Sequence, residues 1–182
     1  MSRILVTVGT DHHRFDRLIG WVDRWSAAHL DADVLVQHGT ADPPDHGKAV
    51  VMLGYDELVA EMAAADVVIA QGGPATIMDA RSVGQRPIVV PRLGRFDEVV
   101  DDHQVAFTDW MAAKDLVWLA GSEEELHALI DASLTDPSRV KIPPERGASA
   151  ATIEAFRAVV DPLTDRRAGR QPWRRRSPAG PG

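Results

Sequence analysis

The segment from residue 66 to residue 80 constrains the fold of this chain more than any other part of it. Residues 66–70 (DVVIA) form a short apolar run of the kind found in a strand that is covered on both faces. Gly72 and Gly73 then allow a tight turn, and Pro74 suits the first turn of a helix. The segment therefore predicts a parallel strand, a glycine turn and a helix.

The same turn has the chemistry of an anion site. Backbone amides at a helix N-terminus, together with the positive end of the helix dipole, favour a negatively charged group such as a diphosphate. Asp79, about one turn into the predicted helix, can accept hydrogen bonds from ribose hydroxyls. The alternative is a connection that binds nothing, in which Asp79 only stabilises the helix N-terminus, because glycine-rich turns are common in α/β folds.

Strand and helix patterns alternate along the chain, which predicts an α/β fold with a doubly wound, mainly parallel sheet. Ser122 and Glu125 have the spacing of a capping box at a helix start. The first helix should follow Gly9 and Thr10 and bury residues at helical spacing, namely Phe15, Leu18, Ile19, Val22 and Trp25. We expect strands at 3–8, 34–37, 49–53, 66–70, 87–91 and 116–120, and further helices at 56–64, 74–83, 98–113, 122–134 and 148–160.

Length and charge divide the chain into a body and a tail. Its 182 residues suffice for one domain with a sizeable core. Residues 163–182 contain six arginines and one aspartate, a net of +5; since the whole chain carries −7, residues 1–162 carry −12. We expect a folded domain over 1–162, too acidic for general nucleic-acid binding, and a disordered tail over 163–182. The tail could contact anionic lipid headgroups or an acidic partner, or stay solvated without one.

No stretch of the sequence reaches the roughly 20 apolar residues that a membrane-spanning helix needs. The sequence runs from Met1 directly into the first predicted strand, without the features of a secretory leader. The chain has no cysteine, which excludes disulfides and thiolate metal sites. We therefore expect a cytoplasmic protein.

Candidate metal ligands are poorly arranged in the sequence. Asp31 and Asp33 have the spacing of a metal-binding Asp-x-Asp pair, but we interpret them as part of a turn between a helix and a strand. A second set has two intervening prolines and no regular spacing: His38, Asp42, Asp45 and His46. We expect no metal and no other cofactor, since helix dipoles can stabilise a diphosphate. The chain also lacks the Gly-x-x-x-x-Gly-Lys-Ser/Thr and Gly-x-Gly-x-x-Gly patterns, which disfavours kinase, ATPase and dinucleotide oxidoreductase chemistry.

Six segments of the sequence occur in a characteristic order: residues 6–10 (VTVGT), 15–18 (FDRL), 65–69 (ADVVI), 72–78 (GGPATIM), 87–92 (PIVVPR) and 100–104 (VDDHQ). Together they resemble the C-terminal, donor-binding domain of glycosyltransferase family 28, over roughly residues 3–135. Within the family, the chain is similar to stand-alone catalytic subunits of two-part transferases in polysaccharide and lipid-linked oligosaccharide synthesis. The resemblance implies a single Rossmann-like sheet, the donor-binding half of a two-domain, GT-B type enzyme, with a UDP-sugar as donor.

The resemblance also implies roles for individual positions. The first glycine turn, Gly9 and Thr10, should approach the diphosphate. Gly54 and Tyr55 should lie against the uracil. Asp79 should bind the ribose, with a side chain one methylene shorter than the family's usual glutamate. The second phosphate turn and its flank comprise Gln71, Gly72, Gly73, Pro74, Ala75 and Thr76; many relatives have histidine in place of Gln71 and glycine in place of Ala75.

Three residues are candidates for direct roles in catalysis. The resemblance implies that His103 and Gln104 face the hydroxyls of the donor sugar. His13, just beyond the first turn, could donate to a phosphate or help to deprotonate the acceptor, as could its neighbour His12, since histidine titrates near neutral pH. The alternative is a surface loop whose histidines have neither role.

These inferences lead to a UDP-sugar-dependent, inverting glycosyltransferase that transfers N-acetylglucosamine or another hexose to a lipid-linked acceptor. Because the resemblance covers only the donor half, it implies a membrane-associated partner subunit that binds the acceptor and recruits the chain to the inner face of the plasma membrane. Two alternatives stay open. One is a non-catalytic nucleotide-sugar-binding or scaffold subunit, and the other is a single-chain nucleotide-sugar hydrolase or epimerase.

Overall fold

The computed structural model describes residues 1–100 and 103–145, which form a six-stranded parallel sheet. The strand order is β3-β2-β1-β4-β5-β6, the doubly wound order in which the chain reverses direction across the sheet between β1 and β4. The predicted fold class is therefore confirmed. The strands are β1 (Arg3–Thr7), β2 (Asp33–Gln37), β3 (Lys48–Val50), β4 (Val67–Gln71), β5 (Ile88–Val90) and β6 (Trp118–Leu119).

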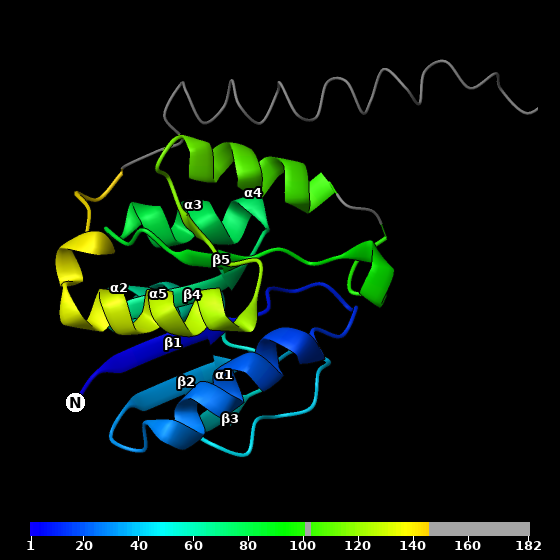
Figure 1. Ribbon diagram of the computed structural model, residues 1–182, viewed down its shortest axis with the longest axis horizontal. Coiled ribbons are helices and arrows are strands. Elements are labelled where there is room, and N and C mark those ends of the chain that lie inside the picture. Colours follow the sequence, from blue (N-terminus) through cyan, green and yellow to red (C-terminus); the bar gives the residue numbers. More distant parts are fainter. Residues whose placement is uncertain (101–102, 146–182) are drawn as a thin grey trace, which may run out of the picture. The chain divides into compact units, whose positions relative to one another are not determined.

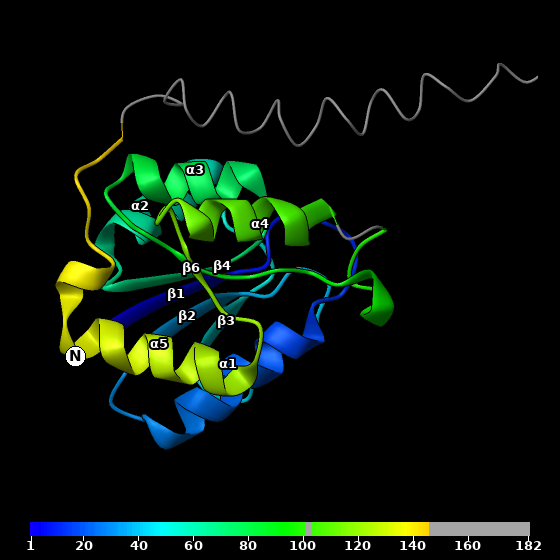
Figure 2. The same ribbon diagram turned by 45° about the horizontal axis from the view of Figure 1, so that its top comes forward.

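Helices cover both faces of the sheet, as a parallel sheet requires (Figure 1). The helices are α1 (Asp16–Ala28), α2 (Tyr55–Ala64), α3 (Pro74–Ser82), α4 (His103–Ala113) and α5 (Glu123–Thr135). Figure 2 shows α1 and α5 side by side below the sheet and α3 and α4 above it. Short 3-10 turns lie at Gly94–Phe96 and Pro137–Arg139.

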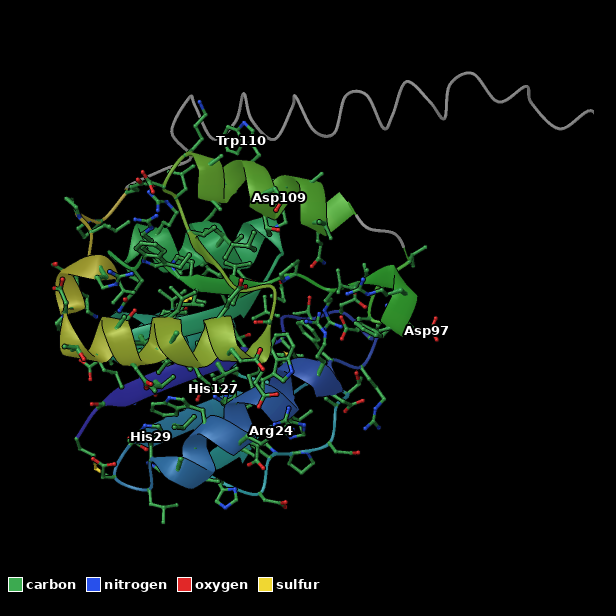
Figure 3. All side chains as sticks on the ribbon, in the orientation of Figure 1. Arg24, His29, Asp97, Asp109, Trp110 and His127 are labelled. Atoms are coloured by element: carbon green, nitrogen blue, oxygen red, sulfur yellow. The ribbon has the colours of Figure 1, made fainter. Side chains whose placement is uncertain are left out.

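The larger part of the core lies between the sheet and the pair α1 and α5. Leu126 and Ile130 of α5 pack there against residues that the helical spacing predicted to be buried, and all of those are buried: Phe15, Leu18, Ile19, Val22 and Trp25. Figure 3 shows Arg24 and His127 where the two helices meet. The ring of His127 hydrogen-bonds the carbonyl of Trp21 through Nε2 at 2.8 Å, which joins α5 to α1. Hydrophobic burial and this hydrogen bond together hold α1 against the sheet and α5.

The opposite face has a smaller core under α2 and α3. Met62 and Ala80 are fully buried there against Leu5 and Val68 of the sheet. The predicted capping of α5 is also observed, since Ser122 accepts a hydrogen bond from the backbone N–H of Glu125 at 3.2 Å. The carboxylate of Glu125 accepts from the N–H of Gly121 rather than from that of Ser122.

Helix α4 begins later than the sequence predicted, at His103 instead of residue 98. Glu98 is 3% exposed and is held outside the helix, because its carboxylate accepts hydrogen bonds from the guanidinium of Arg17 and from the N–H of Leu93. Asp97, just before it, has a left-handed backbone with φ of 55°. The apolar spacing of residues 98–113 could not reveal these long-range contacts.

The edge strands β3 and β6 are shorter than their predicted ranges of 49–53 and 116–120. The predicted helix at 148–160, the boundary at 162/163 and the tail lie outside the described residues. In the described part of the chain, no helix combines the length and the apolar character needed to cross a membrane.

Candidate functional site

The strand order creates a cleft at the carboxyl edge of the sheet. Ligands of doubly wound folds bind where the strand order reverses, because the loops after the two central strands diverge there. Here those strands are β1 and β4, paired in register from Ile4 opposite Val67 to Thr7 opposite Ala70. Both glycine turns follow them directly, and a cleft of about 590 Å³ lies between the turns.

Most of the residues that the resemblance assigned to the donor line this one cleft: Gly9, Thr10, Tyr55, Gln71, Gly73, Pro74, Ala75, Thr76, Asp79 and Gln104. Gly54 directly precedes Tyr55, and Gly72 faces α4, where a Cβ would collide with Thr108. The backbone of His103 starts α4, and its side chain lies outside the described atoms. His13 lines a neighbouring hollow of about 550 Å³ instead.

The first turn is held by polar groups that no sequence motif marks. Gly9 has a left-handed backbone with φ of 74°, a conformation that glycine adopts without steric cost. Its N–H donates to Thr7 Oγ1 at 3.2 Å. Gln37, at the end of β2 and 1% exposed, donates from Nε2 to Thr7 Oγ1 and to the carbonyl of Gly9. The only sequence signal for Gln37 is a polar residue ending an apolar strand.

The second turn is organised by Gln71. Its Oε1 accepts a hydrogen bond from the N–H of Gly73, and its Nε2 donates to Thr76 Oγ1 at 3.2 Å. The side chain of Gln71 therefore fills the space between the two turns, and a Cβ at Gly9 or at Gly73 would overlap it. Pro74 begins α3, as predicted. The turn thus presents the N-terminus of α3 to the cleft, with one of its amides paired to Gln71.

Tyr55 and Asp79 meet across the cleft from two different helices. The hydroxyl of Tyr55, at the start of α2, donates to Asp79 Oδ1 on α3 at 3.2 Å. The negative charge of Asp79 and its hydrogen bond raise the pKa of Tyr55 above its ordinary value, and burial and the charge of Asp56 contribute less in the same direction. The two side chains assigned to the uracil and the ribose are therefore coupled directly.

This coupling can be measured because Tyr55 is the single tyrosine of the chain. Asp79 raises the pKa of Tyr55, so Asp79→Asn should lower it towards the ordinary value, and tyrosinate should form at lower pH than in the parent protein. Absorbance of tyrosinate during alkaline titration reports this residue alone. Asp33→Asn, at the opposite edge of the sheet, is the control and should leave the curve in place. Coincident curves for Asp79→Asn and the parent would exclude the contact in solution.

Arg92, two residues after the end of β5, joins the first turn to the rest of the site. Its side chain is fully buried, and its guanidinium donates to the carbonyls of Val8 at 2.9 Å, His13 at 2.8 Å and Glu98 at 2.9 Å. Burial lowers the pKa of Arg92, while the charges of Asp11 and Glu98 act in the opposite direction. Arg92 ends the family segment at residues 87–92, but no sequence signal predicts its role.

The loop between β1 and α1 brings Asp11, His12 and His13 together. Asp11 Oδ1 lies 2.6 Å from Nδ1 of His13 and 3.6 Å from Nδ1 of His12. Burial of Asp11 would raise its pKa, but hydrogen bonds from His13 and the charge of Arg92 outweigh that effect and hold the pKa below its usual range. Within the described residues, no other group of three His, Asp or Glu residues is gathered this closely.

The two ligand sets weighed in the sequence are not assembled. Asp33 begins β2 and pairs with Lys48 at 2.7 Å, far along the strand from the cleft. His38 is buried and hydrogen-bonds the carbonyl of Ala41, whereas His46 contacts Asp23.

Sequence comparison supports the resemblance. The profile of the family described as glycosyltransferase family 28 C-terminal domain matches residues 3–161. Among curated proteins, no sequence matches the chain.

Three solved structures illustrate the shared fold. MurG of Acinetobacter baumannii aligns with a TM-score of 0.53 and 17% identity, over 92% of this chain and 50% of MurG. The glycosyltransferase of kitacinnamycin aligns with a TM-score of 0.52 and 16% identity, over 90% of this chain and 39% of its own. The solution structure of ALG13 aligns with a TM-score of 0.53 and 15% identity, over 90% of this chain and 96% of ALG13. The chain thus spans about half the length of MurG.

Proposed function

The chain belongs to the glycosyltransferase family 28 C-terminal domain family, and on this premise we propose that it is the donor-binding, catalytic subunit of an inverting glycosyltransferase that uses a UDP-sugar. One observation carries the proposal. Both glycine turns, the N-terminus of α3 and the Tyr55–Asp79 pair lie on a single cleft where the strand order reverses. A diphosphate, a ribose and a base are the groups that such a set can recognise.

The proposed pose of the UDP-sugar follows from the chemistry of the residues that line the cleft. The diphosphate lies between the turns, where the positive end of α3 stabilises the charge that develops on the departing UDP. Asp79 accepts from the ribose hydroxyls, and Tyr55, which is exposed, stacks on the uracil. His103 and Gln104 contact the sugar hydroxyls, and His13 acts from the neighbouring hollow on a phosphate or on the acceptor. No metal is required for this pose.

We further propose that the acceptor half is a separate, membrane-associated subunit that presents a lipid-linked acceptor. The described residues contain one doubly wound sheet, whereas a GT-B enzyme needs two Rossmann-like halves that face each other across the reaction site. Coverage of the neighbours is consistent with this division, because the alignment spans half of MurG but 96% of ALG13. The sugar, N-acetylglucosamine or another hexose, is transferred when both halves meet.

Calorimetric titration with UDP and UDP-sugars tests the donor proposal. Binding should occur, and Asp79→Ala should weaken it, since a hydrogen bond to a charged group contributes about 1.5–3 kcal/mol, or roughly 10- to 150-fold in affinity. Circular dichroism should show an intact fold, because Asp79 is only partly buried. Asp33→Ala removes a carboxylate at the other edge of the sheet and is the matched control.

The outcomes separate the proposal from its alternatives. Absence of UDP binding, by the chain alone and with its partner, would refute donor binding. Equal affinities for Asp79→Ala and Asp33→Ala would remove Asp79 from the site. Sugar transfer by the chain with its partner that survives both His103→Ala and Asp79→Ala would favour a scaffold role, and turnover of UDP-sugar by the chain alone would favour a hydrolase or epimerase.

A further inference from the structure

The loop that carries Asp11, His12 and His13 is fixed by contacts that do not involve the histidine rings. The carbonyl of His13 accepts from Arg92 at 2.8 Å, and the carbonyl of His12 accepts from Thr40 Oγ1 at 3.0 Å. The N–H of His13 donates to Asp11 Oδ1 at 2.9 Å. The backbones of His12 and His13 are therefore set in place, and the Asp11 carboxylate is held beside them.

The donor atoms of this loop form a chelating arrangement. One atom from each residue can be chosen so that all three lie within 4.8 Å of one another, and the two imidazole rings are 4.1 Å apart between centroids. Two imidazoles and a carboxylate are a ligand set that suits a borderline divalent ion such as Zn²⁺. Of the nearby cations, Arg14 is already paired with Asp16 and Asp42.

We propose that Asp11, His12 and His13 form a binding site for a divalent transition metal of the Zn²⁺ class. The ion replaces the hydrogen bond between Asp11 and His13, and His12, with a side chain that is 85% exposed, supplies the third ligand from the solvent side. Three protein ligands leave a fourth position for water or an incoming oxygen. Mg²⁺ is disfavoured, because it prefers oxygen ligands.

The site borders the donor cleft and departs from the metal-free chain that the sequence led us to expect. Asp11 lines the cleft between the glycine turns, whereas His12 and His13 line the neighbouring hollow. The ion would thus lie between the donor cleft and the neighbouring hollow. Sequence spacing gave no sign of it, since metal ligands are usually recognised by gaps between them and these three are adjacent.

Titration of the full chain with Zn²⁺ by calorimetry, and with Co²⁺ by visible absorption, tests the site without any nucleotide. One ion should bind per chain, and Co²⁺ should show the intense bands of four-coordination. His12→Ala and Asp11→Asn should each lose at least about 10- to 100-fold in affinity, because loss of a direct ligand should cost no less than loss of an outer-shell partner. His12 is largely exposed and Asn can still accept from the N–H of His13, so both variants should fold.

His46→Ala is the matched control, because His46 also lies beside a carboxylate, at 3.1 Å from Asp23, but belongs to no group of three such ligands among the described residues. It should retain the parent affinity. The inference is overturned if the parent chain binds neither ion, if His12→Ala and Asp11→Asn bind as tightly as the parent, or if His46→Ala loses as much affinity as they do. None of these outcomes depends on whether the chain binds UDP.

Discussion

Arg92→Met should destabilise the protein by about 3 kcal/mol or more, because each buried acceptor left without a partner costs about 1–3 kcal/mol. The substitution removes the donor of the carbonyls of Val8 and Glu98, whose hydrogen bonds are buried, and of His13, whose hydrogen bond is partly buried. It also removes the guanidinium that lies 4.6 Å from the centroid of the Phe15 ring. Urea unfolding followed by circular dichroism measures the change. Arg92→Lys should recover little, since an ammonium cannot reach acceptors in several directions at once as a planar guanidinium does.

Arg24→Met is the control for Arg92→Met. Arg24 also makes a two-pronged contact, with Glu123 at 2.5 and 2.8 Å, but its side chain is 57% exposed. An exposed ion pair contributes less than about 1 kcal/mol, so this variant should remain close to the parent. If the two variants lose the same small amount of stability, Arg92 does not hold the first turn. UDP affinity should fall in Arg92→Met even at temperatures where it stays folded, because the turn is no longer clamped.

Gly9→Ala should impair both the fold of the first turn and nucleotide binding. The left-handed backbone of Gly9 costs about 1–2 kcal/mol for any residue with a Cβ. The new methyl group would also overlap the amide of Gln71, which must then give up its hydrogen bonds to Gly73 and Thr76. We expect a loss of stability of this size in urea and a fall in UDP affinity of at least about tenfold, the equivalent of 1.4 kcal/mol.

Gly20→Ala tests whether these effects belong to the turn or to any glycine replacement. Gly20 lies within α1, and a methyl group there would meet only the flexible end of Arg24 at 3.3 Å. Alanine should stabilise this helix by roughly 0.5–1 kcal/mol and leave UDP binding unchanged. The double variant Gly9→Ala/Gln71→Ala removes the overlap but keeps the backbone strain, so partial recovery is expected. Parent-like stability and affinity of Gly9→Ala would show that the turn does not need glycine.

Local sequence signals predicted the regular elements well. Burial at helical spacing from Phe15 to Trp25 and the apolar run of β4 are each contained within a few neighbouring residues. The same signals failed at Glu98, where a carboxylate pairs with Arg17 across 81 positions of sequence. Pairings of that range decide where α4 starts, and no local pattern encodes them.

The candidate site divides in the same way. The two turns were predictable, because glycine favours tight turns and proline favours the first turn of a helix. Asp79 and Tyr55 were identified from the family resemblance. Gln37 and Arg92 were missed as supports, because a buried polar side chain reveals its role only when its acceptors, which come from distant loops, are known. The arrangement of Asp11, His12 and His13 also depends on distant residues, because Arg92 and Thr40 hold the backbone of this loop.

The amide of Gln71 has a consequence for how the cleft would accept any anion. Its Oε1 already takes the hydrogen bond of the Gly73 N–H, and its Nε2 is committed to Thr76. An incoming oxygen that uses this N–H must displace an acceptor that the protein itself provides, so association is an exchange rather than an addition. Apparent affinity is then scaled by the fraction of molecules in which Gln71 has turned aside. The Oε1 of Gln71 thus competes with any incoming anion for the N–H of Gly73, and because it belongs to the same chain its effective concentration there is fixed.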